Sequence, residues 1–379
     1  MNTIKDPFNL LDNSKKNEDT FNILDNLDNF RNSLDRFFTL SQPVNSVAKA
    51  SSNTLFGLNA TASRAIVNEN RDRQGFVFFT RPQLNMTAVN LRNVRQMYNL
   101  LTKDPLTVQR YIRCVLDPRQ ATLNNIKSPL IDTNMPFIPV LTNTIKSLSG
   151  WPDITMSNFT SKEGVRKEQY TQADGSTDIF EAYDIDATFK NTRDEPILML
   201  FQYWLVYIGL VFEGVLMPYM DMIAENEIDY NTRIYRLVMD ETNTIVKKIS
   251  CTGASFPVNV PTGKVFDYNN ESVYNNDSSE INIRFRCVGA RYNDAIIVKD
   301  FNKVNEIFNP EVSKLIACNF KESTEHNLIK IPHNLLETLN YRGYPIINTN
   351  TYELEWWINK NSPTTRRLFK LLDNKTIIL

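Results

Sequence analysis

Histidine and cysteine, which commonly perform catalysis or bind metals, are few and scattered in this 379-residue chain. The only histidines are His326 and His333, and their spacing matches no zinc motif such as HExxH. No two cysteines are close enough for a CxxC metal or redox pair. We therefore predict packing or surface histidines and free, buried thiols at the four cysteine positions: Cys114, Cys251, Cys287 and Cys318.

Carboxylates recur along one segment, and a pair of them could perform acid–base chemistry. A solvated strand face explains these four residues more simply: Asp178, Glu181, Asp184 and Asp186. The loop at 267–280 lacks the central glycine of a calcium loop, and Ser278 stands where the bidentate glutamate belongs. No GxSxG, GxGxxG or GxxxxGK[ST] motif occurs. The sequence predicts no enzyme, no cofactor and no metal site.

The charge balance argues against a nucleic-acid-binding protein. Lys and Arg number 42, Asp and Glu number 43, and the formal net charge is −1, so no basic excess is available to neutralise phosphates. The hydrophobic fraction of 42% is ample for a packed core. The first twenty residues are polar, which predicts that no signal peptide is present.

Residues 1–75 are predicted to form an arm with one amphipathic helix. Its apolar positions follow helical spacing and include Leu27, Phe30, Leu34 and Phe37. A single helix cannot bury its own apolar face, so we expect this face to dock on the main body or on a neighbouring subunit.

Residues 76–292 are predicted to be a β domain with an insertion at 90–160, and residues 293–379 a C-terminal extension. The domain begins with a strand at 76–86. Asp174-Gly175 predicts a hairpin turn between extended arms at 165–173 and 176–189, because both residues tolerate positive φ. Only the far end of the second arm alternates apolar and polar residues. The hairpin base should therefore pack on a core, while its tip buries nothing.

Residues 197–212 are almost wholly apolar and predict a helix that starts near Pro196. A membrane span is the alternative, but the run is shorter than the roughly 20 residues that a bilayer requires. Burial on both sides is the simpler interpretation. Residues 232–240 and 244–253 predict a second hairpin, and 281–292 alternates so strictly that it predicts a strand with one core face and one polar face.

This order of elements resembles that of the tail tube proteins of contractile phages and related injection machines. The similarity lies in FFTRPQL, in TFKNTRDEPILMLFQYW at a strand-to-helix junction, in the late hairpin RIYRLVMDETNTIVKKISCTGASFPVNVP, and in the last strand, INIRFRCVGARYND. It covers 76–86 and roughly 165–292, about a third of the chain.

The resemblance implies an α+β fold: an antiparallel β-barrel or sandwich domain with a packed helix, a helical N-terminal arm and a small C-terminal extension. It implies a structural virion protein of the tail that is assembled in the host cytoplasm. Six copies would form a ring around a channel, and DNA would pass through this channel without specific binding. The hairpin would reach the adjacent ring through Lys167, Gln169, Asp174, Gly175 and Asp178.

The polar strand faces would then line the channel or join subunits, with Asp184, Asp186, Arg284 and Arg286 as candidates. Partners would be further copies and other tube, hub, baseplate or sheath proteins, with no membrane partner. The chain is longer than ordinary tube proteins, which favours a specialised ring such as a baseplate initiator or a terminal ring. Two other classes stay open: a virion adhesin or capsid- or neck-decorating protein, and an enzyme such as a wall hydrolase.

Overall fold

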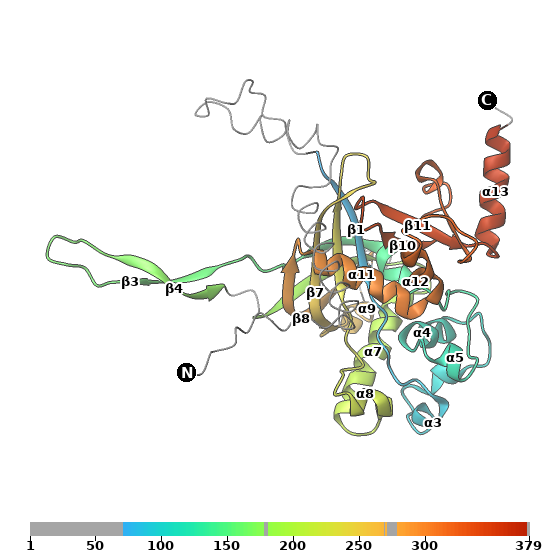
Figure 1. Cartoon of the computed structure of the whole chain (residues 1–379). Coiled ribbons are helices and arrows are strands. Elements are labelled where there is room, and N and C mark those ends of the chain that lie inside the picture. The colour runs from blue at the N-terminus through green and yellow to red at the C-terminus, as the bar shows by residue number, and fades with distance from the viewer. Residues whose placement is uncertain (1–70, 178–180, 269, 271–278, 377–379) are drawn as a thin grey trace, which may run out of the picture.

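A six-stranded antiparallel sheet forms the centre of the protein. The computed structural model describes residues 71–177, 181–268, 270 and 279–376, and the strand order is β1-β6-β7-β8-β5-β2 (Figure 1). Helices pack on this sheet, which confirms the predicted α+β class. The sheet is open, with β1 and β2 at its edges, so the barrel expected from the resemblance does not close within one chain. The strands are β1 (Arg73–Phe79), β2 (Ile145–Ser149), β5 (Ala182–Lys190), β6 (Ile234–Met239), β7 (Val246–Pro257) and β8 (Glu280–Tyr292).

One face of the sheet carries a large hydrophobic core, which we call the first core. Alternating residues of β5 and β8, such as Ile185 and Phe285, are fully buried there beneath α7 (Pro196–Phe212). Segment 90–160 belongs to the same core, because its helices contribute buried side chains such as Leu100 and Ile112, and the segment includes edge strand β2. These helices are α3 (Ala88–Leu91), η1 (Tyr98–Leu101), α4 (Val108–Leu116), α5 (Gln120–Leu123) and α6 (Pro139–Thr144).

The C-terminal region forms a second core on the opposite face of β1. Alternation along β1 sends Phe79 into the first core and Phe78 into the second, where its ring lies 5.4 Å from Phe301 and 6.3 Å from Trp356. The predicted division at 292/293 stays a prediction, although the C-terminal segment clearly supplies this second layer. Its elements are α11 (Ala295–Phe308), α12 (Pro310–Ala317), β9 (Leu328–Lys330), η2 (His333–Leu335), β10 (Tyr344–Ile347), β11 (Leu354–Asn359) and α13 (Pro363–Thr376).

Helix α7 begins at Pro196, as its sequence predicts, and packs one face on the sheet. Trp204 and Tyr207 are fully buried, whereas Phe212 at the last turn is 93% exposed. The prediction of burial on both sides is therefore wrong at the C-terminal end of this helix. Among the described residues, no helix is both long and apolar enough to cross a bilayer.

The Arg-Pro pair after β1 has a structural role that its pattern alone does not reveal. Arg81 is 4% exposed and donates hydrogen bonds to the carbonyl oxygens of Val115 (3.1 Å) and Met135 (3.0 Å), and to that of Cys114. The carbonyls of Cys114 and Val115 belong to the last turn of α4, where backbone acceptors lack helical partners. Arg81 therefore ties α4 and the loop before α6 to the end of β1.

The predicted arm lies mostly outside the described residues. Its helix and its docking residues, Leu27, Phe30, Leu34 and Phe37, fall within 1–70, so the docking of this apolar face stays a prediction.

Candidate functional site

A two-stranded ribbon projects far from the body of the protein. β3 (Met156–Thr160) pairs antiparallel with β4 (Thr171–Thr177), and the ribbon extends the β2–β5 pair at the edge of the sheet (Figure 1). The arm from Trp151 to Val165 would span about 45 Å at ~3.3 Å per residue. A long ribbon is present, as the sequence predicts, but its paired arms are β3 and β4 in place of 165–173 and 176–189. Its base lies at the first core, and its outer part lies away from that core.

The turn of this hairpin is not where the sequence pattern places it. The chain reverses between Ser161 and Tyr170. The Ser161 N–H donates a 2.8 Å hydrogen bond to the Tyr170 carbonyl oxygen, and the Tyr170 N–H donates a 2.9 Å hydrogen bond to Ser161 Oγ. Asp174 and Gly175 lie inside β4, at an irregularity in its register with β3. Gly175 has a φ of +108°, so this glycine supplies the positive φ that a β-bulge requires, and the chain does not turn here.

The root of the ribbon is fixed by close packing. Gly150 follows β2 with a φ of +101°, and a Cβ at this position would lie 2.2 Å from the carbonyl oxygen of Asp184. The next residue, Trp151, packs its ring 6.0 Å from that of Tyr292. The Tyr292 hydroxyl donates a 2.5 Å hydrogen bond to the carbonyl of Pro152. The ribbon therefore leaves the body in a defined direction.

The outer ribbon buries almost none of its own side chains. Every residue of β3 is exposed, and its apolar residues include Met156 and Phe159, at 54% and 50% exposure. At the turn, Lys167 has a φ of +63°, and Gln169 is exposed beside it. Asp178 lies outside the described residues. A two-stranded ribbon is marginally stable alone, so these apolar groups are suited to contact with another molecule.

The four candidate channel residues come together on the exposed face of β5 and β8. Asp184 is directly opposite Arg286 and Asp186 directly opposite Arg284 in the strand register. Arg286 Nη1 lies 3.0 Å from Asp184 Oδ1, and Arg284 Nε lies 3.0 Å from Asp186 Oδ1. Each strand sends the intervening apolar residues into the first core. The period of two thus places all four charges on one side.

Charges on this face cancel in pairs. The hydrogen bond to Asp186 raises the pKa of Arg284 above its ordinary value, so this guanidinium is charged at every physiological pH. All four side chains are between 39% and 54% exposed, and water therefore screens their interaction. The face is polar and hydrated with no net charge from these residues.

The comparison with known families decides the class of this protein. The model of the family described as "Putative phage tail tube protein" matches residues 12–369. The chain belongs to this tail tube family. The match extends beyond 76–86 and 165–292, the segments that carry the sequence resemblance. It includes most of the C-terminal layer, so this layer is part of the tail tube family's sequence pattern.

Two solved structures show local similarity to this tail tube family member. The anti-feeding prophage tube-terminating cap is 15% identical, with 42% of this chain and 83% of the cap covered and a TM-score of 0.26. The sheath/tube terminator of an extracellular contractile injection system (PVC), in its extended state, is 14% identical, with 41% and 86% covered and a TM-score of 0.24. Among curated proteins no match is found.

The ion pairs of the polar face should contribute little to folding. We expect Arg284→Gln to leave the thermal midpoint unchanged within experimental error, because water replaces an exposed partner at little cost. The matched control is Ile283→Ala, one residue earlier and fully buried, which should cost about 2–5 kcal/mol of unfolding free energy. A loss of several degrees for Arg284→Gln would mean instead that the pair holds β5 against β8.

The histidines and cysteines of the described chain differ in burial, and both histidines contact backbone carbonyl oxygens. His326 is buried with its ring against Trp357 and its Nε2 2.9 Å from the carbonyl oxygen of Lys321. His333 is exposed and its Nε2 lies 3.2 Å from the Thr242 carbonyl oxygen. Three cysteines are buried free thiols, as predicted, and Cys318 is partly exposed. Within the described ranges, no three His, Cys, Asp or Glu residues are grouped to hold a metal ion.

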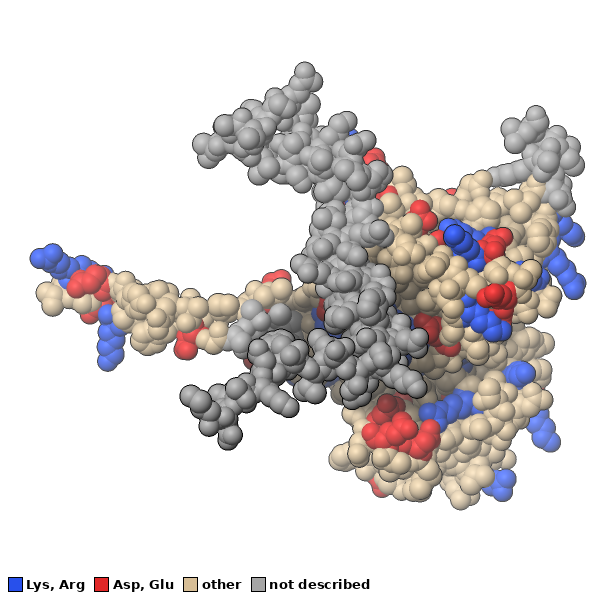
Figure 2. All heavy atoms as spheres, viewed as in Figure 1, with Lys and Arg blue, Asp and Glu red and all other residues tan. Residues whose placement is uncertain are grey.

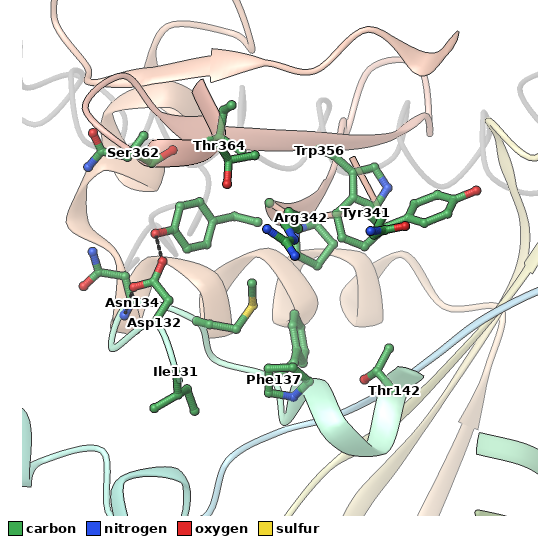
Figure 3. Close-up of a pocket in the computed structure, with 18 of the residues that line it drawn as sticks. Ile131, Asp132, Asn134, Phe137, Thr142, Tyr341, Arg342, Trp356, Ser362 and Thr364 are labelled. Carbon is green, nitrogen blue, oxygen red and sulfur yellow. Dashed lines mark hydrogen bonds between the residues drawn. The ribbon is translucent and has the colours of Figure 1, made fainter. Parts of the chain in front are cut away.

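A cavity of about 930 Å³ opens between β1, the loop before α6 and the C-terminal sheet (Figure 3). It contains the charged side chains of Asp132 and Arg342, and Asp132 Oδ2 accepts a 2.5 Å hydrogen bond from the Tyr344 hydroxyl. No second carboxylate, histidine or cysteine is among its described lining residues. The acid–base pair of a hydrolase is therefore not assembled in this cavity, and Trp356 at its wall is buried.

Proposed function

We propose that this protein is a ring-forming structural component of the phage tail tube or of the baseplate tube that begins it. Six copies form a ring, the polar face of β5 and β8 lines a channel, and the β3–β4 ribbon contacts the adjacent ring. Its place is in the tail of the virion, and assembly takes place in the host cytoplasm. Family membership over 12–369 favours this function over a virion adhesin or a capsid- or neck-decorating protein.

The observation that carries the proposal is a ribbon without a core of its own on a sheet with open edges. The outer edges of β1 and β2 have no partner strand within the described chain. Unpaired strand edges promote association, and closure of a ring of subunits removes them. The exposed Met156, Phe159 and Tyr170 of the ribbon would lose their contact with water when a second ring covers them.

The polar face supports passage of DNA without retention. A binding groove for nucleic acid needs Lys and Arg side chains that are not already paired with carboxylates, so that they can neutralise phosphates. On the polar face of β5 and β8, Arg284 and Arg286 are each paired with an aspartate 3.0 Å away. These residues therefore give the face no net positive charge. DNA would contact such a wall only weakly.

The size of the chain supports a specialised ring. Segment 90–160 and the C-terminal layer provide surfaces that a minimal tube subunit would not need. We place the protein at the baseplate start of the tube in preference to its repeated shaft. Hub, sheath and baseplate proteins are the partners that such added surfaces would contact.

Electron microscopy of the purified full chain tests the proposal directly. We expect rings with sixfold symmetry and an open channel in views down the particle axis, alone or after addition of hub proteins. A compact monomer under both conditions would contradict the proposed function and favour the adhesin alternative.

A further inference from the structure

The end of α7 and the short helix α8 (Met220–Ala224) form an acidic, apolar projection, which we call the acidic tip (residues 212–228). Residues 194–232 contain no Lys or Arg and seven acidic residues. Figure 2 shows Asp and Glu atoms gathered at the lower end of the molecule, where Figure 1 places α8. Four of the seven lie in the tip: Glu213, Asp221, Glu225 and Glu227. Asp194 and Glu195 precede the start of α7, and Asp229 is buried.

The acidic tip is firmly attached to the body, so its exposed groups are held in place. The Tyr219 hydroxyl donates to Asp117 Oδ2 (2.8 Å), and burial raises the pKa of this carboxyl group. Asp221 forms an ion pair with Arg119. Leu216 is buried in the first core. The tip is therefore a built surface rather than a loose loop.

The outer face of the tip combines apolar groups with unmatched negative charge. Phe212 and Met220 are 93% and 71% exposed. Glu213, Glu225 and Glu227 are exposed and form no ion pair with any described residue. A partner that fits this surface must supply positive charges around an apolar contact.

Helix α13 of the same chain has this complementary chemistry. Its Leu368 is buried in the second core, which anchors the helix and fixes which face points outward. Arg366, Phe369 and Lys370 share the outward face through i, i+3 and i+4 spacing, with Arg367 beside them, and all four are exposed. None of the three cations forms an ion pair within the described chain.

The two surfaces cannot meet within one copy. Figure 1 places α13 and α8 at opposite ends of the molecule, and Figure 2 shows Lys and Arg atoms on the flank beside α13. Two different complementary patches on one chain generate a head-to-tail contact, which closes into a ring when the rotation permits. We propose that the outward face of α13 in one copy binds the acidic tip of the next copy. This inference rests on the proposed ring.

Charge exchange between the two surfaces tests this contact. One variant carries Arg366→Glu, Arg367→Glu and Lys370→Glu, and the other carries Glu213→Lys, Glu225→Lys and Glu227→Lys. All six side chains are exposed, so both variants should melt like the wild type. Each variant alone should need at least about tenfold more protein for half-maximal assembly in sedimentation velocity, because like charges then face each other.

A one-to-one mixture of the two variants should assemble like the wild type. In a ring of alternating variants every α13 face meets a tip of opposite charge, and a ring with an even number of copies permits this alternation. A single chain that carries all six substitutions should also assemble. The matched control, Lys299→Glu with Lys303→Glu and Glu306→Lys on α11, should not change assembly.

Three outcomes would overturn the inference. Wild-type assembly by each variant alone would show that the contact is absent from the ring. Loss of assembly in each variant without rescue in the mixture would show that the two surfaces do not contact each other. A wild-type chain that stays monomeric at every concentration would remove the proposed ring together with this interface, whereas the first two outcomes leave the ring intact.

Discussion

Replacement of residues 158–173 by Asn-Gly will leave the protein folded but will prevent its rings from stacking. This change joins Ser157 to Asp174 by a two-residue turn and removes the outer part of the β3–β4 ribbon. The lost side chains are largely exposed and belong to neither core, so the thermal midpoint should stay within about 2 °C of the wild type. Electron microscopy should show single rings and no tubes at concentrations where the wild type stacks.

Smaller substitutions separate the apolar contact from the length of the ribbon. Phe159→Ser combined with Tyr170→Ser keeps the strands paired but removes two exposed rings, and it should shorten the tubes without abolishing them. The control is Val89→Ser on α3, which removes an apolar group that is 83% exposed away from the ribbon. Tubes of normal length after removal of 158–173 would exclude the ribbon from ring stacking.

Arg81→Met will destabilise the protein by about 3–5 kcal/mol. The guanidinium is almost fully buried, and burial lowers its pKa to about 10, so it remains charged at neutral pH. Methionine fills a similar volume but cannot donate hydrogen bonds. The carbonyls of Cys114, Val115 and Met135 would then be buried without these donors, and each such loss costs about 1–3 kcal/mol.

Chemical unfolding of the Arg81 variants measures this effect. Arg81→Lys should recover part of the loss, because one ammonium group reaches fewer acceptors than the planar guanidinium. The control, Arg92→Met, replaces an exposed arginine next to α3 and should change the unfolding free energy by less than about 0.5 kcal/mol. Equal stability of Arg81→Met and the wild type would show that water satisfies these carbonyls when the arginine is absent.

Strand β8 shows how far local pattern can predict this fold. Its alternation requires only that one side of the strand faces a core, and the pairing with β5 then places Arg284 and Arg286 opposite Asp186 and Asp184. Other local signals identified the β6–β7 hairpin and the start of α7, where Pro196 suits the first turn. These features depend on neighbours in sequence or on a single buried face.

The position of the hairpin turn shows where local pattern fails. Asp174-Gly175 tolerates positive φ, and both a tight turn and a bulge require this property. Which of the two forms depends on the strand that pairs with this segment. That partner is β3, some fifteen residues earlier, whose own sequence carries no strong alternation. The pattern therefore indicated a ribbon correctly but assigned its turn to the wrong residues.

Residue types and short periods were enough to establish the class of protein, the main strands and the apolar helix, and to show that the sequence carries no recognisable catalytic motif. The three-dimensional packing was needed to show that Arg81 ties α4 to β1, that α7 leaves Phe212 exposed, and that the acidic tip and α13 lie at opposite ends. Each of these depends on contacts between residues far apart in the chain. Such contacts follow from the packing of whole elements, which no local period encodes.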